Sequence, residues 1–214
     1  GIYASEKIKK VEDLKGKQIA VSAPNSMPDM LARSALAKFG ISDSDVKLAA
    51  VGGDKDRYQA LIGGVVDAAV VSNEYQPIAP KSIHLLVAGR EAVPNFLRVC
   101  MVSSAKKLAE RGDDAVKFLA AEMAALRFAL ANRDATIALT RELIHAKPDD
   151  PRPAFVYDDA IQHHAVDPTL PLPADKIQWI QEQMVKAGKL KVPLDLKAVT
   201  APEYREKALK VIGH

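Results

Sequence analysis

The sequence predicts an α/β fold, with a mostly parallel sheet in residues 1–103 and a helical C-terminal segment in residues 104–214. Three observations support this. Short apolar runs rich in β-branched residues alternate with helical patterns over the first hundred residues. One run, "VVDAAVVS" at 65–72, is apolar almost throughout, which is typical of a strand covered on both faces. After residue 103 the apolar residues recur mainly at helical spacing. The alternation indicates a parallel sheet with helices on its faces.

The first predicted elements are a helical turn at 10–16, a strand in "QIAVSA" and a helix over 26–39. Ser26 is the expected N-cap of that helix. Pro28 in the first turn and an acidic residue three positions after the cap complete a capping-box pattern. The helix is expected to end at Gly40, as a C′ glycine followed by an apolar residue.

The rest of the first hundred residues continue the alternation. Asp54 is a candidate N-cap for the second helix, and Cys100 lies in the last apolar run, where we expect a small buried side chain. In order, we expect a strand over 45–52, a helix from Asp54 to the Gly63-Gly64 pair, a strand over 65–72, a short helix or turn over 73–79, and strands over 83–89 and 97–103.

The C-terminal segment is predicted to be helical. A long helix should begin at Asp113, with an apolar stripe on one face. The stripe contains Val116, Leu119, Met123, Leu126 and Leu130. Further helices are expected from Asp134 to about Ala146, over 154–165 and 174–187, and from "APEYREKAL" onwards, with a proline-rich loop at 148–153.

Composition excludes several classes of protein. The chain is 48% apolar and 27% charged, which is ordinary for a globular protein. Its net charge of +3 is spread along the chain, and no cluster of basic and aromatic residues predicts nucleic-acid binding. One cysteine allows no internal disulfide. No apolar run approaches the roughly 18 residues of a membrane helix, so we expect no stable membrane insertion. The first 17 residues lack the apolar core of a signal peptide.

The sequence contains no catalytic or metal-binding motif that we can identify. Gly52-Gly53-Asp54 lacks the phosphate-loop pattern and is better explained as a turn and a helix cap. His163 and His164 are adjacent, so on a helix they point about 100° apart and cannot chelate a metal together. No G-x-S-x-G or H-E-x-x-H motif is present. We therefore expect a protein that is not an enzyme and that needs no cofactor or metal.

Several segments resemble the solute-binding proteins of ABC importers, in the nitrate/sulfonate/taurine (NMT1/THI5-like) group. They are "DLKGKQIAV", "ALIGGVVDA", "DDAVKFLAAEMAALRFALANRDATIAL" and "IQWIQEQMVKAGKLKVPLDLKAV". The resemblance implies a type II periplasmic binding fold, in which two α/β lobes close on a small molecule. It also implies a periplasmic protein, an ABC permease as partner and no catalysis. Residues 1–103 would form one ligand-binding lobe, and residues 104–214 would pack on the other.

Members of this group carry most of one lobe before the "DLKGK" segment, whereas this chain begins just upstream of it. We expect the chain to be a fragment or a proteolysed form. Alternatively, a partner supplies the missing strands, or the protein does not close on a ligand. Two other functions stay open. A THI5-like pyrimidine-precursor synthase would need a cysteine-rich motif. The effector lobe of a transcriptional regulator would need a winged helix upstream.

The first candidate site lies in the turn after the strand "QIAVSA". Its predicted ligand-binding residues are Ser22, Asn25, Ser26 and Met27. Carboxyl ends of parallel strands are where ligands of open α/β sheets bind. The free N–H groups of Ser26 and Met27, at a helix N-terminus, could meet a carboxylate, a sulfonate or an amide. The alternative is that Ser26 only caps its own helix.

The second candidate site follows the strand at 65–72, at a position that faces the cleft in the resembling family. Its residues are Ser72, Asn73, Glu74 and Tyr75. Glu74 could accept hydrogen bonds from an amine, an amidine or an aminopyrimidine, and Tyr75 could stack on a ligand ring. The alternative is an exposed helix start, with Asn73 as N-cap and Glu74 in the first turn.

Overall fold

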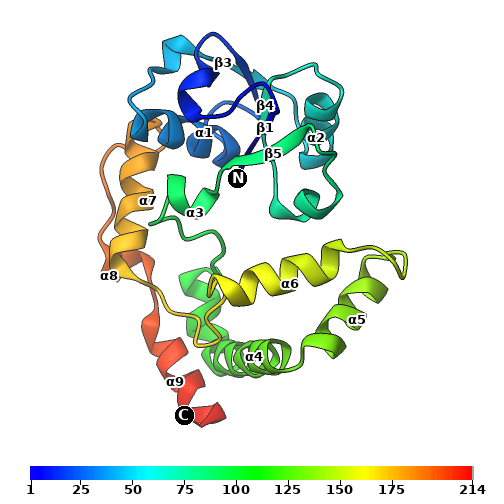
Figure 1. Cartoon of the computed structure of the whole chain (residues 1–214). Coiled ribbons are helices and arrows are strands. Elements are labelled where there is room, and N and C mark those ends of the chain that lie inside the picture. Colours follow the sequence, from blue (N-terminus) through cyan, green and yellow to red (C-terminus); the bar gives the residue numbers. More distant parts are fainter. Residues whose placement is uncertain (214) are drawn as a thin grey trace. The chain divides into compact units, whose positions relative to one another are not determined.

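The computed structural model describes residues 1–213 and contains two compact units, Gly1–Pro94 and Asn95–His214 (Figure 1). The first unit holds the whole β-sheet and the second unit is helical. The division falls at Pro94, whereas the sequence pattern placed the change at residue 103. The difference arises from the segment that follows Pro94, which is described below.

The first unit is built on a five-stranded mixed sheet. Its strands are β1 (Ile2–Ser5), β2 (Gln18–Val21), β3 (Lys47–Ala50), β4 (Ala68–Val70) and β5 (Ile83–Val87), in the order β3-β2-β4-β1-β5. Strand β2 pairs in parallel with β3 and β4, but β1 runs antiparallel to both of its neighbours, β4 and β5. The prediction of a mostly parallel sheet was therefore wrong, since β1 was not predicted as a strand at all.

Helices connect the strands of this unit, and most match the predicted positions. They are η1 (Val11–Leu14), α1 (Met27–Lys38), η2 (Asp43–Asp45), α2 (Asp54–Ile62), η3 (Asn73–Ile78) and α3 (Gly89–Ala92). Helix α1 ends as predicted: Gly40 has φ +67°, and the N–H of buried Ile41 donates to Leu36 O at 2.9 Å. Two caps differ from the prediction. Gly53 precedes α2 where Asp54 was expected, and Ser72 precedes η3 where Asn73 was expected.

The core of the first unit lies between the sheet and helix α2. Every residue of β4 is buried, as the apolar run predicted for a strand covered on both faces. One buried cluster joins four strands to α2 and consists of Tyr3, Ala20, Tyr58, Leu61, Val66, Ala69, Val71 and Ile83. Burial of this apolar surface is the main force that holds the strand ends in place.

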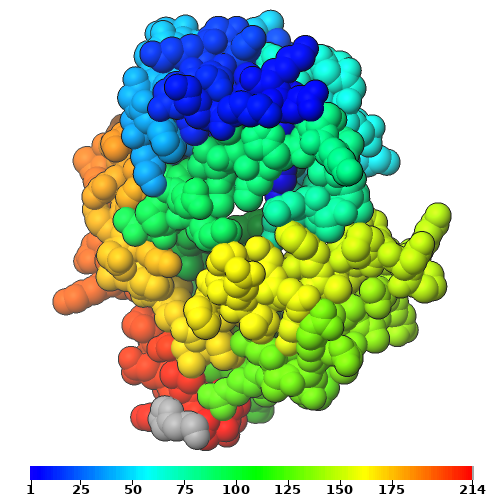
Figure 2. All heavy atoms as spheres, viewed as in Figure 1, coloured from blue at the N-terminus to red at the C-terminus, as the bar shows by residue number. Residues whose placement is uncertain are grey.

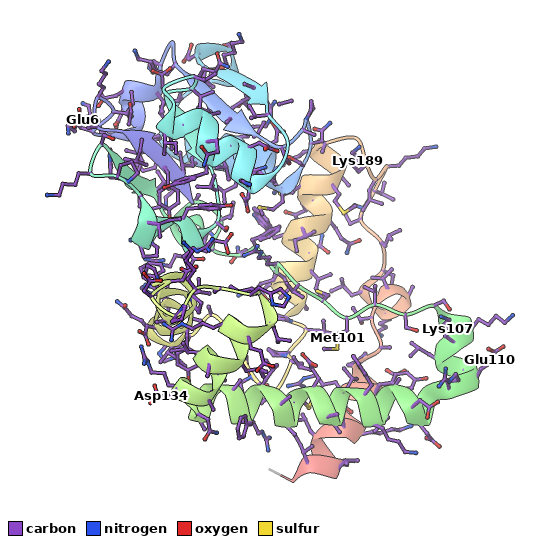
Figure 3. The ribbon with its side chains drawn as sticks, turned by 90° about the vertical axis from the view of Figure 1, so that its right-hand side faces the viewer. Glu6, Met101, Lys107, Glu110, Asp134 and Lys189 are labelled. Atoms are coloured by element: carbon purple, nitrogen blue, oxygen red, sulfur yellow. The ribbon has the colours of Figure 1, made fainter. Side chains whose placement is uncertain are left out.

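The segment after Pro94 is not the strand that its composition predicts. Residues 95–104 contain no helix or strand, and Figure 3 shows Met101 on this stretch. Val99 is 79% exposed and Val102 is 91% exposed. Cys100 is exposed too, so its expected burial was also wrong. β-Branched residues favour a strand only where another strand supplies hydrogen bonds, and none of the described residues pairs with this segment.

The second unit is helical, as predicted. Its helices are α4 (Ala105–Ala131), α5 (Arg133–Leu143), α6 (Arg152–Gln162), α7 (Ala174–Lys186), α8 (Leu196–Val199) and α9 (Pro202–Ile212). Helix α4 begins at Ala105 with Ser104 as its cap, earlier than the predicted start at Asp113, and Arg111 interrupts it with non-helical angles. Figure 3 shows Lys107 and Glu110 on the part of α4 before this kink.

Helices α4 and α9 form the core of the second unit. Val116 and Met123 of the predicted stripe are buried there with Ala120 and Ala208. Gly112 allows a close approach, because a Cβ atom at this position would lie 2.9 Å from the ring of Tyr204. Helices α5 and α6 also contact each other (Figure 2), through an ion pair of 2.7 Å between Arg133 and Asp158. Within residues 1–213, no helix is long and apolar enough to cross a membrane.

Candidate ligand-binding edge

The sheet brings the two predicted site segments to the same edge. Strands β2 and β4 are parallel neighbours, with Ala20 opposite Ala69. Ser22 directly follows β2, and Ser72 follows β4 by two residues. Adjacent strands lie about 4.8 Å apart, so the two segments are neighbours. Continued past the strand ends, the register puts Ser22 opposite Val71, and Ser72 comes one residue later. We call the segments 22–27 and 72–75 together the carboxyl edge.

Two hydroxyl groups of the carboxyl edge are available to a ligand. Ser22 and Ser72 are both half-buried. Neither side chain has a hydrogen-bond partner among the described residues, and Ser72 does not use its hydroxyl to cap η3. A serine hydroxyl can donate one hydrogen bond and accept two, so these groups can meet either kind of polar atom.

Ser26 is committed to its own helix. Its hydroxyl donates to Ala23 O at 2.6 Å and accepts from the Asp29 N–H at 3.4 Å, and its own N–H donates to Ala23 O at 3.2 Å. Pro28 has no N–H. Of the two N–H groups proposed as anion donors, therefore, that of Ser26 is already used, and only that of Met27 stays open. The start of α1 is a poor anion site.

Asp29 is buried, and its carboxylate organises the turn. The side chain is 3% exposed and its Oδ2 accepts from the Asn25 N–H at 3.0 Å and from Arg33 Nε at 2.9 Å. The predicted capping box would have paired Asp29 with the N–H of Ser26, which instead faces Ala23. Asn25 adopts φ +59° to bring its N–H to the carboxylate. The hydrogen bond to Asp29 also raises the pKa of the Arg33 guanidinium.

Replacing Ser26 with alanine separates the capping role from a ligand-binding role. We expect Ser26→Ala to lower the free energy of unfolding by about 1 kcal/mol, because the Asp29 N–H loses its acceptor. Urea denaturation followed by circular dichroism measures the change. Ser26→Asp should recover most of the lost stability, since aspartate also caps helices well. A stability equal to that of the unmodified chain in Ser26→Ala would contradict the capping role.

The second segment of the carboxyl edge holds one ring and one free carboxylate. Tyr75 stacks on Tyr58, with ring centroids 4.4 Å apart and an interplanar angle of 26°. The Tyr58 hydroxyl donates to Ile78 O at 3.2 Å, and burial raises its pKa. The ring expected to stack on a ligand thus has a stacking partner within the unit. Glu74 is half-buried, and no described residue forms a hydrogen bond or ion pair with its carboxylate.

Arg57 is the residue at this edge that the sequence did not single out. It is 4% exposed, and its Nε donates to Val70 O at 2.6 Å. Its other guanidinium nitrogens contact Gly52 O and the Asp54 carboxylate. Arg57 thereby joins the ends of β3 and β4 on either side of β2. The sequence did hold one signal for Arg57: it lies three residues after Asp54, a spacing that suits an ion pair on a helix.

The adjacent histidines and the surface hollow of the second unit provide no further candidate site. His163 lies 3.5 Å from Asp159, and the described residues contain no group of three or more side chains suited to hold a metal ion. A surface hollow of about 570 Å³ in the second unit includes none of the predicted site residues. It is lined by Ala138, Arg141, Glu142, His145, Ala146 and Pro148.

Comparison with known proteins agrees with this architecture. A sequence model described as NMT1/THI5 like matches residues 2–136, more than half of the chain. No curated protein matches. Among solved structures, the periplasmic aliphatic sulphonate binding protein SsuA from Escherichia coli is 19% identical, with a TM-score of 0.70 over 94% of this chain and 65% of its own. The alkanesulfonate-binding protein SsuA from Xanthomonas axonopodis pv. citri, bound to MOPS, is 22% identical. Its TM-score is 0.64, and the match covers 88% of this chain and 64% of the SsuA chain.

An enzyme shares the fold as well. A DszB mutant in complex with biphenyl-2-sulfinic acid is 15% identical, with a TM-score of 0.68 over 99% of this chain and 76% of its own. At these identities the matches establish the fold alone. This chain spans about two thirds of the length of the two sulfonate-binding chains, 65% and 64%.

Proposed function

The chain belongs to the NMT1/THI5-like family, and from this premise we propose that it is part of a solute-binding component of an ABC transporter. Its role is to bind a small organic solute in the periplasm and to present it to the permease, without catalysis. The observation that carries the proposal is the carboxyl edge, where half-buried Ser22 and Ser72 follow neighbouring parallel strands and their hydroxyls have no partner among the described residues. Edges of this kind are the usual ligand-binding position of open α/β sheets.

The proposed mechanism is closure of two lobes on the solute. A ligand favours the closed state only if it binds that state more tightly than the open one. The residues of the carboxyl edge would supply the contacts from one lobe. The opposite wall would come from a lobe equivalent to the part of the sulfonate-binding chains that this chain does not span. We therefore propose that Gly1–Pro94 is the ligand-binding lobe and that the helical unit packs on the other lobe.

An enzyme is the second candidate function, because the DszB structure shares the fold. The described residues offer little support for covalent catalysis. Cys100 is exposed in a segment without helix or strand, and no described residue forms a hydrogen bond with its thiol. A catalytic cysteine needs a neighbouring base or positive charge to form a thiolate at neutral pH. A THI5-like synthase would also need the cysteine-rich motif that the sequence lacks.

Removing both free hydroxyls tests the carboxyl edge. We expect these 214 residues alone to bind solutes weakly, with a dissociation constant of about 1 mM, since they span only 65% and 64% of the sulfonate-binding chains and the proposed second wall lies in the remainder. The double variant Ser22→Ala/Ser72→Ala should weaken binding by about tenfold, because each hydrogen bond contributes about 0.5–1.5 kcal/mol. Saturation-transfer NMR with amines, alkylsulfonates, carboxylates and aminopyrimidines measures both quantities.

The matched control is Ser103→Ala, which removes an exposed hydroxyl from the second unit. It should leave every dissociation constant unchanged. Absence of binding across the whole panel would contradict the solute-binding proposal. Equal weakening by the control and by the double variant would show that the solutes do not bind at the carboxyl edge. A micromolar dissociation constant for the isolated monomer would overturn the expectation of weak binding.

A further inference from the structure

Helix α4 carries apolar side chains on two opposite faces. One face packs on α9, where Val116 and Met123 are buried. The opposite face holds two phenylalanines, Phe118 and Phe128, which are 60% and 59% exposed. Figure 3 shows the helix along its length. A helix that is apolar on all sides is normally covered on all sides, so the exposed face is a candidate interaction surface.

The exposed face has the spacing of a coiled-coil seam. Its residues are all exposed and are separated alternately by four and three positions: Asp114, Phe118, Ala121, Ala125 and Phe128. This alternation is the heptad spacing with which one helix packs along another. The two alanines allow a second helix to approach closely at the centre, and the two rings cover the contact at its ends. We call these five residues the outer face of α4.

Two residues of opposite charge, Lys117 and Glu122, flank the outer face on its two sides. With 3.6 residues per turn, they lie about 60° and about 80° from the centre of the face. Neither side chain forms an ion pair with any described residue. In a parallel pair of helices in register, such a lysine faces the glutamate five positions further on in the other helix. Two copies of α4 therefore supply each other with the partner charges that each copy lacks.

We infer that the outer face of α4 binds a second copy of the same chain, as a parallel pair of helices related by a twofold axis. A symmetric pair of this kind uses the same patch on both partners. The charges favour the parallel direction, because an antiparallel pair centred on the two alanines would bring the Glu122 side chains of both copies together. The inference does not depend on the proposed function.

The other charged residues on this part of α4 do not oppose pairing. Asp114, at one end of the outer face, is paired with Arg111 at 2.8 Å, so each copy brings a neutral pair to that end. Asp113 and Arg127 lie about 100° or more from the centre of the face. Arg127 also donates to Gly213 O at 3.1 Å.

The size of the outer face predicts a weak dimer. From Asp114 to Phe128 the helix is about 21 Å long. The two rings together expose roughly 250 Å². Each partner would bury roughly 400 Å², about half of what a standard interface buries on each side. We therefore expect a dissociation constant of about 100 μM for the dimer.

Sedimentation equilibrium of the full chain, from about 10 μM to about 1 mM, measures this dissociation constant. A reducing agent is needed, because Cys100 is exposed and could crosslink two copies. Ala125→Glu should weaken the dimer at least about tenfold, because it places two like charges at the centre of the contact. The matched control is Ala135→Glu, which adds the same charge at an exposed position of α5 and should leave the dissociation constant unchanged.

Exchange of the flanking charges tests the partner and the direction together. Lys117→Glu and Glu122→Lys should each weaken the dimer about fivefold, because like charges then face each other across the pair. The double variant Lys117→Glu/Glu122→Lys should recover the original dissociation constant. Thermal melts check that each variant folds.

Three results would overturn the inference. They are a chain that stays monomeric at about 1 mM, equal weakening by Ala125→Glu and Ala135→Glu, and a double variant that dimerises no better than the single ones. A monomeric chain would leave the outer face to a different partner, such as the second lobe, and the solute-binding proposal would stand.

Discussion

Replacing Arg57 with methionine is expected to lower the free energy of unfolding of the first unit by about 3–4 kcal/mol. Methionine fills a similar volume, but it cannot donate to Val70 O and Gly52 O or pair with Asp54. The substitution therefore leaves the buried carbonyl of Val70 without its donor, and the loss of the partly exposed ion pair with Asp54 adds to the cost. Urea denaturation followed by far-UV circular dichroism, with hydrogen exchange to assign the change to the first unit, measures the loss.

Arg90→Met is the control for this substitution. Arg90 is exposed on the short helix α3, so its loss should change the free energy of unfolding by less than about 0.5 kcal/mol. If both variants lose the same small amount of stability, Arg57 does not hold the ends of β3 and β4 in place. A large loss in Arg57→Met alone would support its role in fixing the spacing of the carboxyl edge.

The second large loss of folding stability is expected in the helical unit. Met123 is completely buried between α4 and α9, and Met123→Ala should cost about 2–5 kcal/mol through lost burial and the cavity that remains. Trp179, the one tryptophan in the sequence, lies in α7 of the same unit and provides a fluorescence signal for its unfolding.

Met184→Ala is the matched control for Met123→Ala, since Met184 on α7 is 36% exposed. The same atoms are deleted in both variants, so the difference between them isolates burial. We expect Met184→Ala to lower the free energy of unfolding clearly less than Met123→Ala does. Equal losses in the two variants would contradict the assignment of Met123 to the core of the second unit.

The features that were predicted correctly depend on neighbours in the sequence. Ser26 and Gly40 bound helix α1 because caps act within one turn of the helix. The continuous apolar run around β4 predicted burial on both faces, which the structure confirms. The end of α7 at Gly188, with φ +68°, follows from the same local chemistry. In each case the deciding interactions are close along the chain.

The features that were missed depend on distant parts of the chain. Strand β1 has only four residues, and its hydrogen bonds come from β4 and β5, so its own composition gave little signal. Residues 97–103 have the composition of a strand, but composition does not supply the neighbouring strand that a sheet requires. The predicted capping box was also missed. The Ser26 N–H donates to Ala23 O, so the Asp29 carboxylate accepts from the Asn25 N–H instead.

Only part of the candidate site could be predicted from the sequence. The alternation of strands and helices predicted that the segments of Ser22 and Ser72 share one edge, and parallel pairing of β2 with β4 in the structure makes these segments neighbours. The sequence could not show which polar groups were already engaged. Ser26 and Tyr75 have partners in the structure, whereas the carboxylate of Glu74 has none among the described residues. Whether these residues contact a solute stays a prediction.

The place of β1 in the sheet has a consequence for the order of folding. Ile2 pairs with both Val70 and Val87, so the first strand of the chain joins residues from the far end of its unit. Such contacts close long loops, and the entropy of loop closure makes them form slowly. Strands β2, β3 and β4 are linked by short helical connections and can assemble first. We therefore expect β1 and β5 to dock last, which makes their insertion the rate-limiting step in folding of the first unit.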